Sequence, residues 1–230
     1  GGIVLHDVVN IRHAEKALEA GVDGLILVAS GAGGHAGTLS PFALVGEVRK
    51  FFKGPIALSG SIATGDANAA RKAFVAREAV AGGVLMARDL VTHPGGVKAA
   101  VAAVHESGMR PTGFQVLRDF EGLSGHLHSY KLDIAKAMLE MCAATGSKVL
   151  LACSSTSRHA TQDLDQIAAD LKKLAMLAVP LGIKVAYEAL SWGRTVNEFT
   201  TSWDVVCRAD CPNLGIGIDS FHIFAAKTPL

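Results

Sequence analysis

Short apolar segments alternate along this chain with longer segments in which apolar and polar residues are mixed. Most of the short segments are rich in Val, Ile and Leu without polar alternation, which is typical of parallel strands buried on both faces. Eight strands are predicted, at Ile3–Val9, Gly24–Ala29, Pro55–Gly60, Gly83–Ala87, Thr112–Leu117, Lys148–Cys153, Lys184–Leu190 and Leu214–Asp219.

The mixed segments between these strands predict helices. They cover Ile11–Ala20, Pro41–Phe51, Ala67–Val80, Gly95–Glu106, His128–Ala144, Asp163–Val179 and Val196–Ala209. Because repeated βα units with right-handed crossovers can close a barrel, the predicted fold is an α/β (βα)8 barrel of TIM type, formed as one domain by residues 1–230. A doubly wound open sheet is the alternative, since strand order is not visible in a sequence.

The composition narrows the function classes. Hydrophobic residues make up 50% of the chain and the formal net charge is +1, so nothing indicates binding to nucleic acid or to an anionic membrane. There is no signal-like start and no apolar run of 18 residues, and the four cysteines form no C-x-x-C pair. We therefore expect a cytoplasmic protein with buried thiols that acts on a small molecule, and the methionines are expected to fill its core.

A glycine-rich loop, Gly31–Gly37, follows the second predicted strand and precedes the helix that begins at Pro41. Its glycines let backbone N–H groups approach a ligand closely, and the next helix offers its positive end. His35 is the only titratable side chain in the loop, so it is a candidate general base. A flexible loop with an incidental histidine is the alternative.

The loop belongs to a set of five characteristic segments in the first part of the chain, namely Ile3–Val9, Ala20–Ile26, Gly31–Gly37, Ser40–Val45 and Ser59–Gly60. Together, over roughly residues 1–65, they resemble the nitronate monooxygenase (2-nitropropane dioxygenase-like) family. The resemblance implies an FMN-dependent barrel, with His35 as the base that removes the proton beside the nitro group and Gly60 and Ser61 near the flavin phosphate.

Two carboxylates end successive predicted strands further along the chain, namely Glu188 and Asp219. In a barrel such strands are neighbours, and two converging carboxylates suit a hard divalent ion such as Mg2+ or Mn2+. Pairing of these acids with arginines is the structural alternative.

Three motifs stand at or next to predicted strand ends, namely Arg118–Gly122, Tyr187–Arg194 and Ile218–His222. With their surroundings, over about residues 61–224, they resemble the sugar phosphate isomerase/epimerase-like (xylose isomerase-like) barrels, with 3-dehydroshikimate dehydratase as the subgroup. The resemblance implies Glu188 and Asp219 as two of four ligands of Mg, Mn or Co, and His222 as a polar catalytic residue that faces the substrate. It further implies Arg118 and Arg194 as substrate-binding residues, and elimination of water beside a ketone.

The two resemblances meet around Ser59–Gly65, which predicts a chimeric barrel with a nitronate monooxygenase-like part (1–65) and a sugar phosphate isomerase-like part (61–230). The first strand would then lie beside the eighth, and His6 and Asp7 would stand next to Asp219, where by position they could replace the missing ligands. The alternative is that His6 is a strand-end histidine bonded to the backbone. Three functions remain in competition: a metal-dependent lyase, an FMN-dependent nitronate monooxygenase, and a barrel scaffold with two incomplete sites.

Overall fold

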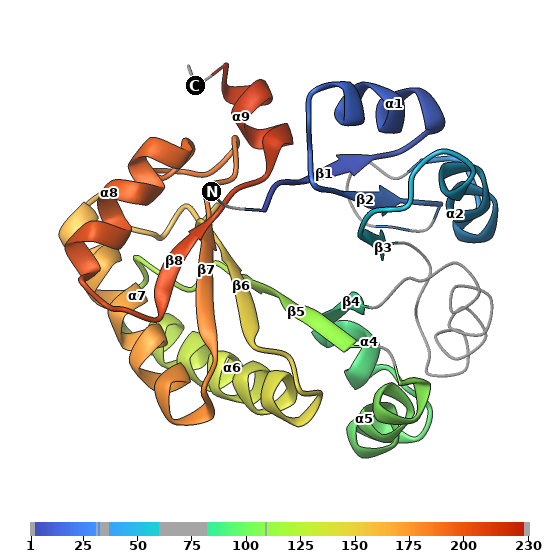
Figure 1. The fold of residues 1–230 in the computed structure, drawn as a ribbon. Helices are drawn as coiled ribbons and strands as arrows, with labels where there is room; N and C mark the ends of the chain where they lie inside the picture. The colour runs from blue at the N-terminus through green and yellow to red at the C-terminus, as the bar shows by residue number, and fades with distance from the viewer. Residues whose placement is uncertain (1–2, 31, 33–36, 60–81, 109, 228–230) are drawn as a thin grey trace. The chain divides into compact units, whose positions relative to one another are not determined.

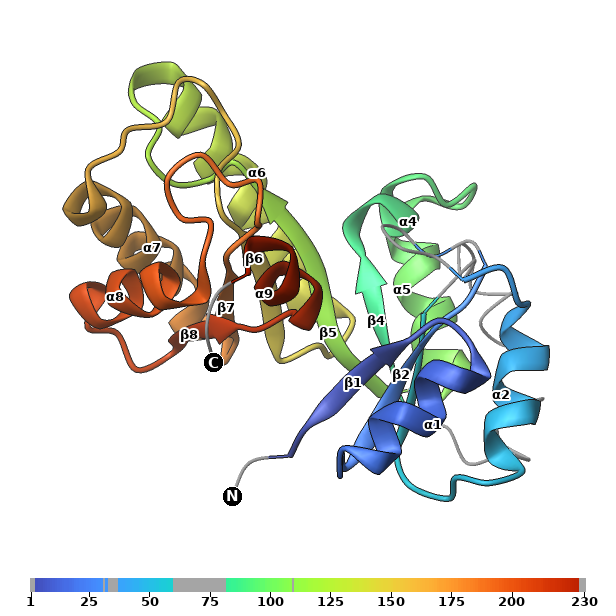
Figure 2. The ribbon, with the colours of Figure 1, turned by 90° about the horizontal axis from the view of Figure 1, so that it is seen from above.

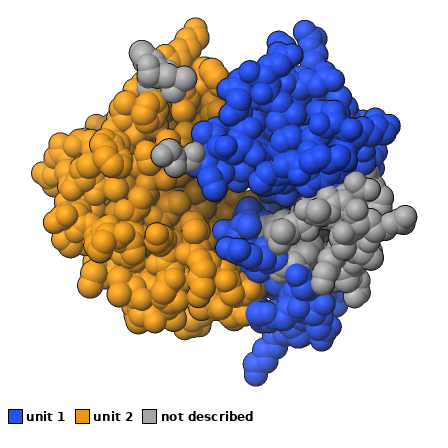
Figure 3. Space-filling model, viewed as in Figure 1, with its two compact units in different colours: residues 1–112 blue, residues 113–230 orange. Residues whose placement is uncertain are grey.

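A computed structural model describes residues 3–30, 32, 37–59, 82–108 and 110–227. The chain divides into two compact units, Gly1–Thr112 and Gly113–Leu230, which are coloured separately in Figure 3. None of the described helices combines the length and the apolar composition that a membrane span requires.

The first unit contains a parallel sheet with the strand order β1-β2-β3. Its core is formed by fully buried aliphatic side chains of the strands and of helix α2, among them Val8, Leu25, Leu27 and Leu44. The elements of this unit are β1 (Leu5–Val8), α1 (Ile11–Glu19), β2 (Gly24–Val28), α2 (Pro41–Arg49), β3 (Ile56–Ser59), β4 (Gly82–Met86), α4 (Ala87–Val91) and α5 (Gly96–Ser107).

Local capping explains where the first two helices begin. The side chain of Asn10 accepts a hydrogen bond from the backbone N–H of His13 at 2.9 Å, and Ser40 accepts one from Ala43 at 3.2 Å. Such caps satisfy backbone donors that the first helical turn leaves unpaired. Pro41 then opens α2 at a position where a missing N–H costs nothing.

The second unit is built on parallel strands in the order β5-β6-β7-β8. Figures 1 and 2 show α6, α7 and α8 together along one side of these strands. The elements are β5 (Arg110–Arg118, whose first residues belong to the first unit), α6 (Gly125–Ala144), β6 (Val149–Cys153), α7 (Leu164–Ala178), the 3-10 turn η1 (Val179–Leu181), β7 (Lys184–Glu188), α8 (Phe199–Ala209), β8 (Leu214–Gly217) and α9 (Ser220–Ala226).

The two faces of this second sheet differ in composition, because successive residues of a strand point to opposite faces. On one face Leu150, Ala152, Val185 and Tyr187 are at most 1% exposed. The other face carries Leu151, Ala186 and Glu188, since a Cβ added at Gly217 would meet these three side chains at 3.1, 3.6 and 3.5 Å. The functional residues described below lie on this second face or at its end.

All eight predicted strands are present, and the predicted parallel α/β organisation is confirmed. The last strand ends at Gly217 and not at Asp219, because Asp219 is the N-cap of the short helix α9. Helices α9 and α4, which are only seven and five residues long, were not predicted from the sequence. The predicted helix Ala67–Val80 lies outside the described residues.

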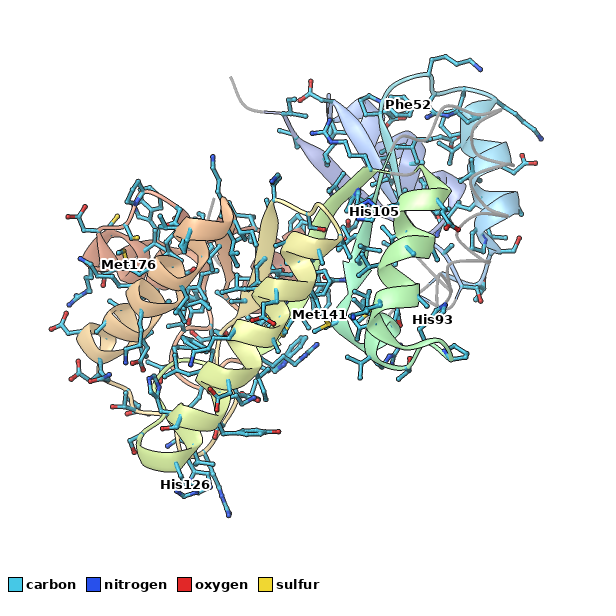
Figure 4. All side chains as sticks on the ribbon, turned by 90° about the horizontal axis from the view of Figure 1, so that it is seen from below. Phe52, His93, His105, His126, Met141 and Met176 are labelled. Carbon is cyan, nitrogen blue, oxygen red and sulfur yellow. The ribbon has the colours of Figure 1, made fainter. Side chains whose placement is uncertain are left out.

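The organisation of the chain as one closed barrel stays a prediction, because the described strands form two sheets and the chain forms two compact units. The expectation that methionines fill the core holds for Met138, which is 6% exposed. It is wrong for Met176 on α7, which is 57% exposed and is labelled in Figure 4.

Candidate active site

A row of side chains crosses the second sheet at the carboxyl ends of its strands. In the strand register Arg118 of β5 pairs with Cys153 of β6, Cys153 with Glu188 of β7, and Glu188 with Gly217 of β8. Residues paired in this way across parallel strands point to the same face of the sheet. The register alone thus places the side chains of Arg118, Cys153 and Glu188 next to one another on adjacent strands.

Three potential metal-binding side chains converge at one end of this row. One ligand atom each of Glu188, Asp219 and His222 lies within 4.8 Å of the other two. Glu188 is the last residue of β7, Asp219 follows β8, and His222 belongs to α9. The predicted convergence of Glu188 and Asp219 is therefore present in the structure.

The turn from β8 into α9 brings Asp219 and His222 together. A carboxylate oxygen of Asp219 accepts a hydrogen bond from the backbone N–H of Phe221 at 2.8 Å and so caps α9. His222 follows within the first helical turn, where its side chain is only 8% exposed. The same capping interaction that starts the helix also positions the carboxylate and the imidazole.

A backbone contact assigns the tautomer of His222. Its Nδ1 accepts a hydrogen bond from the backbone N–H of Ser191 at 3.1 Å, and the Ser191 hydroxyl lies 3.2 Å from the same atom. Because an amide N–H can only donate, Nδ1 carries no proton, and the neutral ring carries its proton on Nε2. His222 therefore presents an N–H donor at Nε2 and no lone pair there for a cation.

Glu188 is held by contacts from β6. The thiol of Cys153 donates to Oε2 of Glu188 at 3.0 Å, and the backbone N–H of Ser154 donates to the Glu188 carbonyl oxygen at 2.8 Å. Burial, reinforced by the neighbouring charge of Glu188, raises the pKa of the Cys153 thiol far above its usual range. The sulfur is therefore a protonated donor and not a thiolate.

The donor set fits a hard divalent cation. The carboxylates of Glu188 and Asp219 are negatively charged oxygen ligands of the kind that Mg2+ and Mn2+ prefer. His222 cannot ligate through Nδ1 while it accepts the Ser191 N–H, and its Nε2 carries the proton. Among the described residues, two carboxylates could thus hold such an ion, with one N–H donor beside them.

An aromatic wall stands beside this cluster. The ring centroid of Trp192 lies 4.8 Å from that of His222 and 6.2 Å from that of Phe221, in edge and tilted arrangements. Trp192 is nevertheless 56% exposed, so one part of its indole faces solvent. Its edge contact with the ring of His222 places the indole beside the cluster of Glu188, Asp219 and His222.

The loop after β7 depends on Gly193. A Cβ at Gly193 would lie 2.6 Å from the Ser154 hydroxyl and 2.9 Å from the Leu190 carbonyl oxygen. Its backbone N–H donates to that carbonyl at 2.7 Å, and the next N–H, of Arg194, donates to Ser155 at 2.9 Å. This tight turn fixes the backbone that carries Trp192 and Arg194.

The two predicted substrate-binding arginines have different settings. Arg118 ends β5 in the row described above, and its exposed side chain shares a face with Cys153 and Glu188. Arg194 is also exposed, and the structure fixes its backbone but places its side chain on no described partner. Arg118 is thus directly associated with the cluster, whereas Arg194 belongs to the loop beside it.

A buried carboxyl group, Glu121, was overlooked in the sequence. It is 2% exposed, and its Oε1 accepts hydrogen bonds from the Ser155 backbone N–H at 2.5 Å and from the Tyr187 hydroxyl at 3.0 Å. Among the described residues its Oε2 has no hydrogen-bond partner. Burial raises the pKa of Glu121 to about 7 against these hydrogen bonds, with a smaller contribution from the charge of Asp119. The signal that the sequence offered for this buried carboxyl group was the position of an acid between Phe120 and Gly122.

Asp119, two residues earlier, behaves in the opposite way. It adopts a left-handed backbone conformation, with φ of 50°, and its Oδ1 accepts hydrogen bonds from the Thr156 N–H at 2.7 Å and the Thr156 hydroxyl at 3.1 Å. Burial raises its pKa, but these bonds, the charge of Lys131 and a bond from Ser155 outweigh burial and lower it overall. Asp119 and Glu121 together tie the end of β5 to the end of β6.

The residues predicted for flavin chemistry cannot be placed. His35, Gly60 and Ser61 lie outside the described residues. His6 and Asp7, the proposed substitute ligands, lie on β1 of the first unit. Their role beside Asp219 stays a prediction.

Comparison with protein families gives one matching model, described as a xylose isomerase-like TIM barrel, over residues 75–229. Among characterised proteins, the chain is 35% identical over 134 residues to 3-dehydroshikimate dehydratase of Pseudomonas aeruginosa. The aligned segment covers 58% of this chain and 21% of the relative. It is 28% identical over 126 residues to inosose isomerase of Bacillus licheniformis, which covers 53% of this chain and 45% of the relative. The chain thus spans about a fifth to a half of the length of these relatives.

Solved structures also match the chain, and they agree with the xylose isomerase-like family model. A xylose isomerase-like TIM barrel/4-hydroxyphenylpyruvate dioxygenase fusion protein matches with a TM-score of 0.63 and 31% identity, over 74% of this chain and 27% of that one. IOLI protein with a bound zinc atom matches with a TM-score of 0.59 and 20% identity, over 70% of this chain and 60% of that one. The match to IOLI protein shows a shared fold. The predicted TIM-barrel fold class is confirmed by the family model and by the match to the fusion protein.

Proposed function

From the premise that the chain belongs to the xylose isomerase-like TIM barrel family, we propose that it is a divalent-metal-dependent lyase of the 3-dehydroshikimate dehydratase type. Such an enzyme eliminates water from a hydroxylated cyclic keto acid. The observation that carries the proposal is the convergence of Glu188, Asp219 and His222 within 4.8 Å. The similarity to two Pseudomonas 3-dehydroshikimate dehydratases supports the choice of reaction.

Glu188 and Asp219 would hold the cation, which we take to be Mg2+, Mn2+ or Co2+. A divalent cation held there would act as a Lewis acid on a substrate carbonyl oxygen and would favour negative charge on that oxygen when the neighbouring C–H proton is removed.

His222 and the arginines would orient the substrate. The Nε2–H of His222 is a directed donor for a substrate oxygen, because Ser191 fixes the ring from its other side. Arg118 would bind the substrate carboxylate, since a guanidinium can make two parallel hydrogen bonds to it. We assign the same type of contact to Arg194. Trp192 would cover a face of the substrate ring and exclude water from it.

The experiment that tests this function is a dehydration assay. The metal-free protein is incubated with 3-dehydroshikimate, with and without Mn2+ or Mg2+, and the dihydroxybenzoate that forms by loss of water and aromatisation is quantified. We expect turnover only with the metal, and its loss in Glu188→Gln and Asp219→Asn. Turnover that is equal with and without metal would reject the metal-dependent mechanism.

The same assay distinguishes the alternatives. A folded protein that binds metal but shows no turnover would leave a barrel scaffold without efficient activity, the third possibility raised by the sequence. A flavin function centred on His35 has no support from the family match or from the relatives described above. The activity of the whole protein stays a proposal, because the chain covers about a fifth of the Pseudomonas relatives.

A further inference from the structure

Cys153 occupies the middle of the row at the strand ends, between Arg118 and Glu188 in the register. It is 3% exposed, and its thiol donates to Oε2 of Glu188 at 3.0 Å. On the other side of Glu188, β8 contributes Gly217, which has no side chain. Of the two residues that pair with Glu188 in the register, Cys153 is therefore the one whose side chain contacts the carboxylate.

The buried thiols of this chain differ in what they contact. Cys142 donates to the carbonyl oxygens of Ser147 and Val149 at 3.7 and 3.8 Å, and Cys211 donates to the side-chain oxygen of Asn213 at 3.1 Å. These three acceptors are neutral, whereas the acceptor for Cys153 is a carboxylate. A thiol is a weak donor, but a charged acceptor strengthens its hydrogen bond.

We propose that Cys153 is a positioning residue of the candidate metal site: its thiol holds the carboxylate of Glu188 in one orientation and is not itself a ligand. The proposal rests on the proposed function only for the identity of the group that Glu188 binds. The half-buried Glu188 side chain has several rotatable bonds, and ordering it on cation binding costs entropy. A donor fixed to Oε2 from the neighbouring strand lowers this cost before the cation arrives.

The first test reads the hydrogen bond directly and needs no metal. In a Cys207→Ser background, which removes the exposed thiol, the S–H stretching bands of the buried cysteines are recorded by infrared spectroscopy. The band lost in Cys153→Ala should lie at a lower wavenumber than the band lost in Cys211→Ser. Glu188→Gln should shift only the Cys153 band, to higher wavenumber. A Cys153 band that does not respond to Glu188→Gln would overturn the proposal.

The second test measures Mn2+ affinity in the same background. Cys153→Ala, which removes the donor, should weaken binding by about tenfold, the lower end of the range for residues that orient a metal ligand. Cys153→Ser keeps a donor of similar size and should restore most of the affinity. Loss of affinity that is equal in both variants would point to packing alone and contradict the proposal.

The alternative role for Cys153, as a ligand, is tested with Cd2+. Cadmium bound by a thiolate gives an ultraviolet charge-transfer band, which should be the same in the background protein and in its Cys153→Ser variant if the thiol only donates. A band that disappears in Cys153→Ser would show ligation and overturn the proposal. If the protein binds no divalent cation, the proposed function fails while the infrared test still decides whether Cys153 orients Glu188.

Discussion

The burial of Glu121 makes the stability of the folded chain depend on pH. Its carboxyl group is protonated more readily in the folded chain than in the unfolded chain, because burial raises its pKa from 4.5 to about 7. A folded pKa above the unfolded value gives stability that is present at low pH. That stability is lost as the pH rises from about 4.5 through about 7.

Replacement of Glu121 by Gln should therefore stabilise the protein at pH 8. The amide oxygen still accepts from Ser155 and Tyr187, while the cost of a buried charge disappears. The rise of this pKa from 4.5 to about 7 corresponds to about 3 kcal/mol in the free energy of unfolding, gained at pH 8 and absent at pH 4. Urea unfolding at the two pH values measures it.

Asp119→Asn is the matched control, and its sign is opposite. The pKa of Asp119 is lowered in the fold, so the ionised carboxylate stabilises the protein above its unfolded pKa, and that stability is lost as the pH falls. The Asn variant should accordingly be less stable than the parent at pH 7 and close to it at pH 3. If both variants changed stability equally at all pH values, the two carboxyl groups would not titrate as described.

At the scale of the element, the loop that leaves β7 depends on the absence of a side chain at Gly193. Gly193→Ala should destabilise the protein by about 1–3 kcal/mol, because the new Cβ meets backbone oxygens that cannot move independently. It should also raise the KM for substrate through displacement of Trp192 and Arg194. Gly215→Ala in β8 is the control, since a Cβ there meets nothing within 4 Å. Equal effects of both substitutions in thermal unfolding would contradict this reading of the turn.

The strands were predictable from the sequence because their apolar runs are continuous and bounded by glycine and polar residues. Strand register was not predictable, since an apolar run does not specify which residue faces which across the sheet. The roles of Cys153 and Gly217 therefore became visible only in the structure. Helix α9 was missed for a different reason: its capping residue Asp219 is also the candidate ligand, and its seven residues are too few to show a helical period.

Four residues of the candidate site were predicted from the sequence. They are the two acids Glu188 and Asp219, together with Arg118 and His222. The sequence could not predict that Ser191 would fix the tautomer of His222, because that contact joins residues 31 positions apart. Glu121 was likewise hidden, since its burial depends on Ser155 and Tyr187 from two other strands or their ends.

At the scale of the whole molecule, the chain consists of two compact units, and Glu188, Asp219 and His222 all belong to the second. Mn2+ at one hundred times its dissociation constant should stabilise the folded state by about 2.7 kcal/mol. By hydrogen exchange, amides of β7, β8 and α9 should become more protected, whereas those of β1 to β3 should not change. Protection confined to the first unit would place the cation elsewhere.

Whether Glu188 and Asp219 hold the cation is tested by the stoichiometry of Mn2+ binding, measured by isothermal titration of the metal-free protein and of Glu188→Gln and Asp219→Asn. We expect one site per chain in the parent protein, lost or weakened by at least about tenfold in each variant while the thermal unfolding of the metal-free variants stays cooperative. One site of undiminished affinity in both variants would contradict the assignment of Glu188 and Asp219 as the ligands.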